Sequence, residues 1–232
     1  MSGEKIDYQI SFLWFNRMAD GRLTFSEGGK EGTYVAMLEA RTRGSVALLT
    51  RDLMHRYLSA MEKNPAGGFR SVSHEAQVTK GKGKNLKERT KRYLFDHEQR
   101  RVHYQRAKEK GEIYHDEMLP MDGPAPNDIL TAMFNFRTGV FGPIRQGAKY
   151  LIPTFSHKGT GNIEIEVLGN DERAYQDFFP EGGFLCRVQV DREIFETGDG
   201  AIYVWFDDQG RPARGIVENV IGLGNVRGVL QE

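Results

Sequence analysis

The chain has 232 residues, with 32 Lys and Arg against 32 Asp and Glu and a formal net charge of zero. Its 39% hydrophobic content and 27 glycines are typical of a globular protein rich in turns, and the absence of about eighteen consecutive apolar residues excludes a membrane-spanning helix. The single cysteine, Cys186, excludes an internal disulfide. Because it shares a strand-like face with apolar neighbours, we expect it to be buried.

The zero net charge hides an asymmetry. Residues 161–232 hold 6 Lys and Arg against 14 Asp and Glu, so the rest of the chain is equally basic, which predicts regions of opposite potential. No repeat or low-complexity linker divides the chain, and we expect a single domain over residues 1–232. The first residues enter strand-like sequence with no signal peptide, which indicates either a cytosolic protein or one whose leader has been removed.

The first third of the chain predicts short strands and one ambiguous segment. Residues 5–25 are typical of a hairpin, and residues 33–39 of a further strand. Residues 45–61 allow either a long helix or a short helix followed by a strand. We favour the second, because Gly44 and the break at residues 64–65 limit the length of a helix.

Strand signals then recur at short intervals on both sides of residue 125. We expect strands near residues 69–79, 89–96, 101–106, 112–118, 150–156, 162–168, 183–190, 201–206, 213–220 and 224–230. In residues 163–167 (Ile-Glu-Ile-Glu-Val) apolar and acidic side chains alternate, as in a strand with one side in water. The pattern predicts a mainly β protein: an antiparallel open barrel or curved sandwich of about ten to twelve strands with one central helix, at about residues 126–138.

The helix signal is clearest in that window, which lies between two β-rich halves. Its apolar residues gather on one face of a 3.6-residue period: Ile129, Leu130, Met133, Phe134 and Phe136. Asn127 is chemically the better of two candidate N-caps, the other being Ala125, and Pro126 suits the first helical position. Gly139 predicts the end. Such a helix needs a large apolar partner, because burying each side chain contributes about 1.5–3 kcal/mol.

Asp128 and Arg137 stand near opposite ends of this helix. They are nine residues apart, which is too far for a pair on one helix face. We therefore expect each side chain to tie its own helix end to the surrounding strands.

Two groups of side chains are candidates for a ligand site. The aromatic residues suited to lining a cavity between helix and sheet are Phe12, Trp14, Phe134, Phe136, Tyr203 and Trp205, and we predict ligand contacts for Phe134, Phe136, Tyr203 and Trp205. Core packing is the competing interpretation. Residues 80–92 hold seven cations and one anion, of which Lys82 and Lys84 are predicted to meet an anionic head group. A solvated hairpin loop is the competing interpretation there.

Other chemistry finds little support in the sequence. The six histidines form no His-x-x-x-His pair, and in residues 115–117 (His-Asp-Glu) neighbouring strand side chains point to opposite faces. No Gly-x-Ser-x-Gly turn presents a nucleophile, and no RNA-binding motif accompanies the cations. We therefore predict no metal, no cofactor, no catalytic residue and no nucleic-acid partner.

Residues 127–137 resemble the Asp-x-Leu-Ser-x-x-Tyr-x-Leu-Arg core of a bacterial family of exported proteins, the domain of unknown function 3108. Asp128 and Arg137 match that pattern, while Thr131 stands for its serine and Phe134 for its tyrosine. Residues 56–59 (Arg-Tyr-Leu-Ser) and a Trp-x-x-Asp-x-x-Arg-x-Pro-like hairpin in residues 204–213 extend the likeness over most of the chain. The resemblance implies an antiparallel β fold and an envelope location in a Gram-negative-type cell, with no known activity.

We accordingly expect a periplasmic or envelope protein, non-enzymatic and not membrane-spanning. It would hold a hydrophobic or amphipathic ligand, such as a lipid or lipid-linked glycan, between the curved sheet and the helix. A structural or assembly factor that binds a protein partner at a sheet edge is the alternative. A hydrolase acting on envelope polymers is a third hypothesis, which requires a cleft holding a titratable group of perturbed pKa.

Overall fold

The computed structural model describes residues 1–12, 15–172, 174–190, 201–220 and 224–231. All the strands in these ranges belong to one antiparallel sheet of 14 strands. The first eight are β1 (Glu4–Phe12), β2 (Phe15–Glu27), β3 (Thr33–Thr42), β4 (Met54–Lys63), β5 (Phe69–Lys80), β6 (Lys87–Asp96), β7 (Arg101–Lys108) and β8 (Glu112–Pro120). The last six are β9 (Lys149–Ser156), β10 (Gly159–Val167), β11 (Phe184–Gln189), β12 (Ile202–Phe206), β13 (Pro212–Val220) and β14 (Gly224–Leu230).

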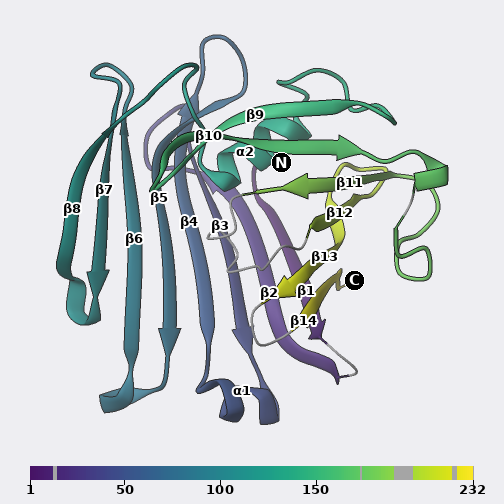
Figure 1. Cartoon of the computed structure of the whole chain (residues 1–232), viewed down its shortest axis with the longest axis horizontal. Helices are drawn as coiled ribbons and strands as arrows, with labels where there is room; N and C mark the ends of the chain where they lie inside the picture. The colour runs from purple at the N-terminus through teal and green to yellow at the C-terminus, as the bar shows by residue number, and fades with distance from the viewer. Residues whose placement is uncertain (13–14, 173, 191–200, 221–223, 232) are drawn as a thin grey trace.

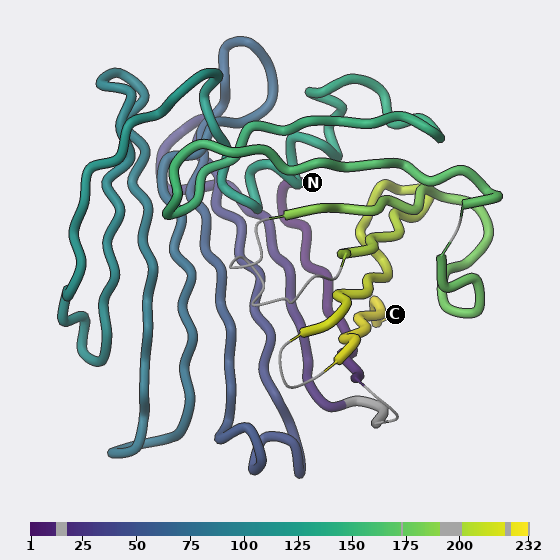
Figure 2. The backbone as a smooth tube through the Cα atoms, in the orientation of Figure 1, coloured from purple at the N-terminus to yellow at the C-terminus, as the bar shows by residue number. Residues whose placement is uncertain are grey.

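The sheet is made of two meanders joined at the chain ends. Strands β1 to β8 each pair with the next, as do β9 to β14, and β1 pairs with β14 to give the order β8-β7-β6-β5-β4-β3-β2-β1-β14-β13-β12-β11-β10-β9. The order does not close, because β8 and β9 are its two ends. Figure 1 shows the sheet curled so that β9 and β10 run across the ends of β4 and β5, and the trace in Figure 2 shows the same crossing.

Two α-helices interrupt the strands, α1 (Gly44–Thr50) and α2 (Ile129–Arg137). Helix α2 lies inside the curl, where both arms of the sheet cover it (Figure 1). Leu130 and Phe134 pack on a cluster from β1 to β4, while Ala132 and Phe136 pack on a cluster from β9 to β12. The apolar residues of α2 therefore hold the two arms together, as a helix of this composition requires.

The ends of α2 correct one part of the sequence analysis and confirm another. The N-cap is Asp128, whose carboxylate accepts from the backbone N–H groups of Leu130 and Thr131, so Asn127 and Ala125 were the wrong choices and Pro126 precedes the helix. Asn127 instead forms a bridge to β9. Gly139 follows the helix with φ of +72°, the left-handed conformation that a terminating glycine adopts at little cost.

The predicted fold class is confirmed as mainly antiparallel β, but the predicted count of ten to twelve strands with one helix was too low. Residues 45–61 contain both the short helix α1 and the strand β4, as the favoured interpretation had it. Cys186 is fully buried in the cluster that holds Phe136. Among the described residues no helix is long and apolar enough to cross a membrane.

Candidate ligand-binding site

A cavity of about 370 Å³ opens between the inner face of β4 to β8 and the edge formed by β9 and the start of α2. Its volume lies near the lower end of the range for small-molecule sites, about 300–1,000 Å³. The residues that line it include aromatic, apolar and cationic side chains: His55, Tyr57, His74, Val78, Lys80, Lys87, Arg89, Lys91, Tyr93, Phe95, Arg106, Tyr114, Ile129, Phe155, His157 and Ile163.

Strand alternation divides the cavity into an apolar and a cationic part. Along β6 alternate residues line the cavity in the order Lys87, Arg89, Lys91, Tyr93 and Phe95, and Thr90 also contributes to the lining. Lys87 and Arg89 are exposed, Lys91 is half-buried, and Tyr93 and Phe95 are buried. One strand therefore carries a gradient from a cationic mouth to an aromatic interior.

The aromatic interior is packed from both arms of the sheet. Tyr93 stacks on Tyr104 of β7 with ring centroids 4.9 Å apart. Phe155 of β9 meets Tyr93 and Phe95 edge-on at 6.3 and 6.1 Å. Edge-to-face pairs of this kind fix ring positions as well as excluding water, so this end of the cavity presents a firm apolar wall.

The cationic part brings like charges together. Two cation pairs among the lining residues stand directly opposite one another on neighbouring strands: Lys80 with Lys87, and Lys91 with Arg106. Opposite side chains on one sheet face have Cβ atoms about 4.5–5.5 Å apart, and like charges there destabilise the sheet. An anion bound between the pairs would relieve this repulsion.

Arg106 has a buried side-chain atom that no described residue satisfies. Its Nε is buried and has no hydrogen-bond partner, while its guanidinium lies 5.3 Å from the ring centroid of Tyr114. A buried N–H without an acceptor costs roughly 1–3 kcal/mol. A ligand oxygen in the cavity would supply the missing acceptor.

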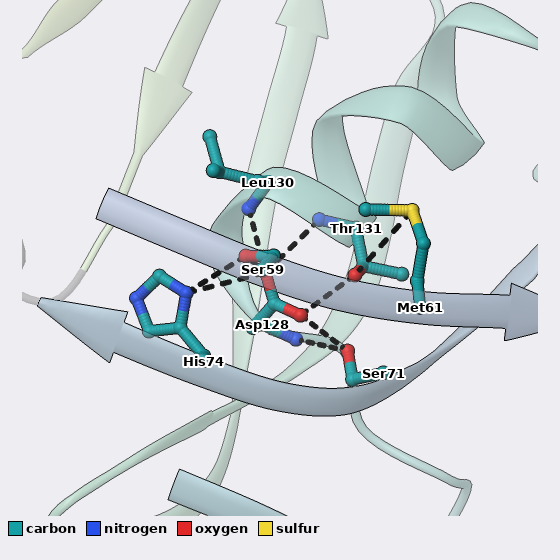
Figure 3. Close-up of polar contacts among 7 residues, drawn as sticks. All are labelled: Ser59, Met61, Ser71, His74, Asp128, Leu130 and Thr131. Carbon is teal, nitrogen blue, oxygen red and sulfur yellow. Dashed lines mark hydrogen bonds and ion pairs between the residues drawn. The ribbon is translucent and has the colours of Figure 1, made fainter. Parts of the chain in front are cut away.

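His74 and Asp128, which also line the cavity, belong to a buried polar cluster around the Asp128 carboxylate (Figure 3). The hydroxyls of Ser59, Ser71 and Thr131 each donate to it, at 2.6, 2.7 and 2.6 Å. The N–H groups of Leu130 and Thr131 also donate to it. The imidazole of His74 lies 3.5 Å from it. These contacts join the start of α2 to β4 and β5.

Burial alone would raise the pKa of Asp128, but the contact with His74 and the hydroxyl hydrogen bonds overcome that effect and hold the pKa well below its usual value. The carboxylate is therefore charged at neutral pH. The Ser59 hydroxyl donates its hydrogen bond to Asp128. In the 2.9 Å contact between Ser59 Oγ and His74 Nδ1 the imidazole N–H is therefore the donor and the hydroxyl oxygen the acceptor. Ser59 is also fully buried. The cluster thus anchors a helix and lacks the activated, accessible hydroxyl that acyl transfer needs.

Arg137 anchors the other end of α2. Its guanidinium donates to both carboxylate oxygens of Glu4, at 2.7 and 2.8 Å, and to the carbonyl of Gly210 at 2.8 Å. These contacts join the helix end to β1 and to the β12–β13 turn. The predicted role of Asp128 and Arg137 as separate anchors is confirmed.

The aromatic residues chosen from the sequence lie elsewhere than the cavity. Phe134 and Phe136 are buried in the two clusters that flank α2. Tyr203 and Trp205 pack on a third cluster with Leu185, and none of these four lines the cavity. Phe12 packs near α1, and Trp14 lies outside the described residues.

The two predicted lysines sit beyond the cavity mouth. Lys82 and Lys84 lie in and beside the short 3-10 helix Gly83–Asn85 that links β5 to β6, and Lys82 pairs with Asp52 at 2.7 Å. The run of cations is thus partly a turn and partly the strand β6. Arg89 and Lys91 line the cavity and belong to the cationic run of residues 80–92 that the sequence singled out, whereas Arg106 lies outside that run. The period-two spacing of cations followed by aromatics in residues 87–95 was a usable signal for the lining face of β6.

A family model described as "Protein of unknown function (DUF3108)" matches residues 7–231. The chain belongs to this family. The match confirms the family indicated by residues 127–137. It names no activity.

Among solved structures, the chain is similar to one titled "Crystal Structure of Beta-barrel-like Protein of Domain of Unknown Function DUF1849 from Brucella abortus". The TM-score is 0.52 with 11% identity, covering 98% of this chain and 95% of that one. At this identity the likeness concerns the fold alone. No curated protein matches the chain.

Proposed function

We propose that this protein binds an anionic amphiphile in the cavity between β4–β8 and β9, with its apolar part against Tyr93 and Phe155 and its anionic group among the cations of β6 and β7. The observation that carries the proposal is the pairing of Lys91 with Arg106 on the inner sheet face. Such a pair of cations at the border of an aromatic pocket is suited to a phosphate or carboxylate head group.

The charge of the cavity favours an anion over a neutral ligand. Among the described residues that line it, the one carboxyl is that of Asp128, which already accepts five hydrogen bonds from its own helix and from β4 and β5. That carboxylate has no capacity left to neutralise Arg106. The volume of about 370 Å³ suits one acyl chain and a head group better than a two-chain lipid.

The test is titration calorimetry with dodecyl phosphate, against neutral dodecyl maltoside, below their micelle concentrations. We expect one dodecyl phosphate per chain and much weaker binding of the maltoside. Arg106→Gln should weaken phosphate binding by about ten- to a hundredfold, because one charge-assisted hydrogen bond contributes about 1.5–3 kcal/mol. Arg101→Gln is the matched control, since Arg101 is exposed on the opposite face of the same strand.

Two results would contradict the proposal: no binding of dodecyl phosphate, or equal binding by wild type and Arg106→Gln. We further propose a periplasmic or envelope location, which is what the resemblance of residues 127–137 to a family of exported proteins implies. Cell fractionation of the native gene product tests it, and recovery in the cytosol alone would refute it.

A structural or assembly role remains a second proposal, which the edge strand β8 favours. Nearly all of β8 is exposed, including Ile113, Tyr114 and Met118, and its outer edge pairs with no other strand in the described residues. A partner strand could add there. Photo-crosslinking from Met118, with exposed Leu94 on β6 as control, should then trap a partner at β8 only.

A further inference from the structure

Helix α1 presents two consecutive leucines to solvent. Leu48 and Leu49 are 81% and 84% exposed, while Val46 and Ala47 of the same helix are buried. Val46 packs on Phe12 and so fixes the helix against the sheet. Single exposed apolar residues are ordinary, but an adjacent pair on a firmly packed helix marks a surface that contacts something apolar.

The turn between β5 and β6 lies beside α1 at the same end of the sheet (Figure 1). The N–H of Gly81 donates to the carbonyl of Arg51 just after α1, and Lys82 pairs with Asp52. This turn adds the exposed Leu86 and the exposed cations Lys80, Lys82, Lys84 and Lys87. The result is a rim of apolar and basic side chains, which we call the leucine–lysine rim.

We propose that the leucine–lysine rim is a docking surface for a bilayer containing anionic phospholipid. Leu48, Leu49 and Leu86 would enter the interfacial region while the lysines contact lipid phosphates. This combination of exposed leucines and lysines is what interfacial membrane binding uses. Each lysine held near an anionic bilayer contributes about 1 kcal/mol, an attraction that salt screens.

The positive charge of the leucine–lysine rim favours an anionic membrane over a protein partner. Between residues 80 and 89 five cations stand against one acid, Glu88, and one of the five, Lys82, is paired with Asp52. An anionic bilayer can meet the other cations wherever their side chains point. A protein partner would need matched acids at fixed positions. The cavity mouth lies at the same end, because Lys80 and Lys87 belong both to the rim and to the cavity lining. Docking would thus turn the cavity towards the lipid.

The test is co-sedimentation of the full chain with phosphatidylcholine vesicles, with and without phosphatidylglycerol. We expect binding only to the anionic vesicles, weakened by salt. Leu48→Ser/Leu49→Ser should lower the partition coefficient by about tenfold or more, given the apolar area withdrawn from lipid. Lys84→Glu should lower it by about tenfold through charge alone. Leu151→Ser is the matched control, because Leu151 is 66% exposed on β9, at the far edge of the sheet.

Thermal melting shows whether each variant is folded. If Leu48→Ser/Leu49→Ser is not folded, Lys84→Glu still tests the proposal. Dodecyl phosphate binding in solution should be unchanged in Leu48→Ser/Leu49→Ser. The docking proposal and the cavity-binding proposal can therefore be refuted independently of each other. Equal binding to neutral vesicles, or no effect of either variant, would overturn the proposal. Concentration-dependent dimerisation of the wild type that the leucine variant abolishes, without vesicle binding, would make the rim an interface between two copies and overturn it equally.

Discussion

Replacing Asp128 by Asn is the sharpest test of how α2 is held in place. The carboxylate accepts five hydrogen bonds, three from hydroxyls and two from backbone N–H groups. The Asn amide keeps one oxygen as an acceptor, while an NH₂ group, which only donates, replaces the other carboxylate oxygen. The hydroxyls of Ser71 and Thr131, which both donate to Oδ2, would then face an N–H₂ group.

The expected loss follows from the bonds that change. A hydrogen bond to a charged acceptor contributes about 1.5–3 kcal/mol, so losing the two at Oδ2 should lower the free energy of unfolding by about 3–6 kcal/mol. That is a large fraction of the roughly 5–15 kcal/mol that stabilises a typical domain. Urea denaturation monitored by circular dichroism measures it.

Asp116→Asn is the control, because the exposed Asp116 also accepts bonds from His103 and Gln105, at 2.6 and 2.8 Å, but lies in water. We expect its urea midpoint to be unchanged. A loss below about 1 kcal/mol in Asp128→Asn, or an equal shift in both variants, would refute the anchoring role of Asp128.

The pH dependence gives a second readout of the same interaction. The folded pKa of Asp128 is lowered from an unfolded value of 3.8, so its contribution is fully present above that value and is lost as the pH falls towards the folded pKa. The difference in stability between wild type and Asp128→Asn should therefore be constant near neutral pH and narrow below 3.8. A stability difference that stays constant below pH 3.8 would show that the charge of Asp128 does not cause the loss of stability in Asp128→Asn.

Two further predictions concern buried groups. Arg137→Gln should lower the free energy of unfolding by about 3–5 kcal/mol, because it leaves the Glu4 carboxylate without its buried partner. The control is Arg22→Gln, since the exposed Arg22 pairs with Asp7. Equal urea midpoints for the two variants would contradict this prediction. Burial raises the pKa of the Cys186 thiol to about 12. The native protein should therefore react with a thiol reagent far more slowly than the urea-unfolded chain. Equal reaction rates would show that Cys186 is accessible in the native protein.

Local patterns predicted most of the elements because each depends on neighbours in sequence. The helix around Phe134 follows from 3.6-residue spacing, and the alternation in residues 163–167 yields β10 with Ile163 and Ile165 buried. The cap was mistaken because Asn and Asp are about equally good N-caps, and the sequence does not show that Ser59 and Ser71 donate to the Asp128 carboxylate. Those serines are 69 and 57 residues away.

The candidate ligand cavity shows the same limit. Phe134 and Phe136 were chosen as ligand contacts because they are aromatic and lie on the helix, yet both arms of the sheet cover them. Lys91 and Arg106 face each other only because β6 and β7 pair in one particular register. A shift of one residue would turn Lys91 to the other side of the sheet.

The sequence by itself determined that this is an antiparallel β protein built around one apolar helix, with charged anchors at both helix ends. Those properties rest on periodicity and residue chemistry within short windows. Only the tertiary structure decided that β1 joins β14, that β8 and β9 are the two edges of the curled sheet, and that cations from several strands share one cavity. Such pairings bring together residues far apart in the chain, and their free energy comes from contacts that no local window contains.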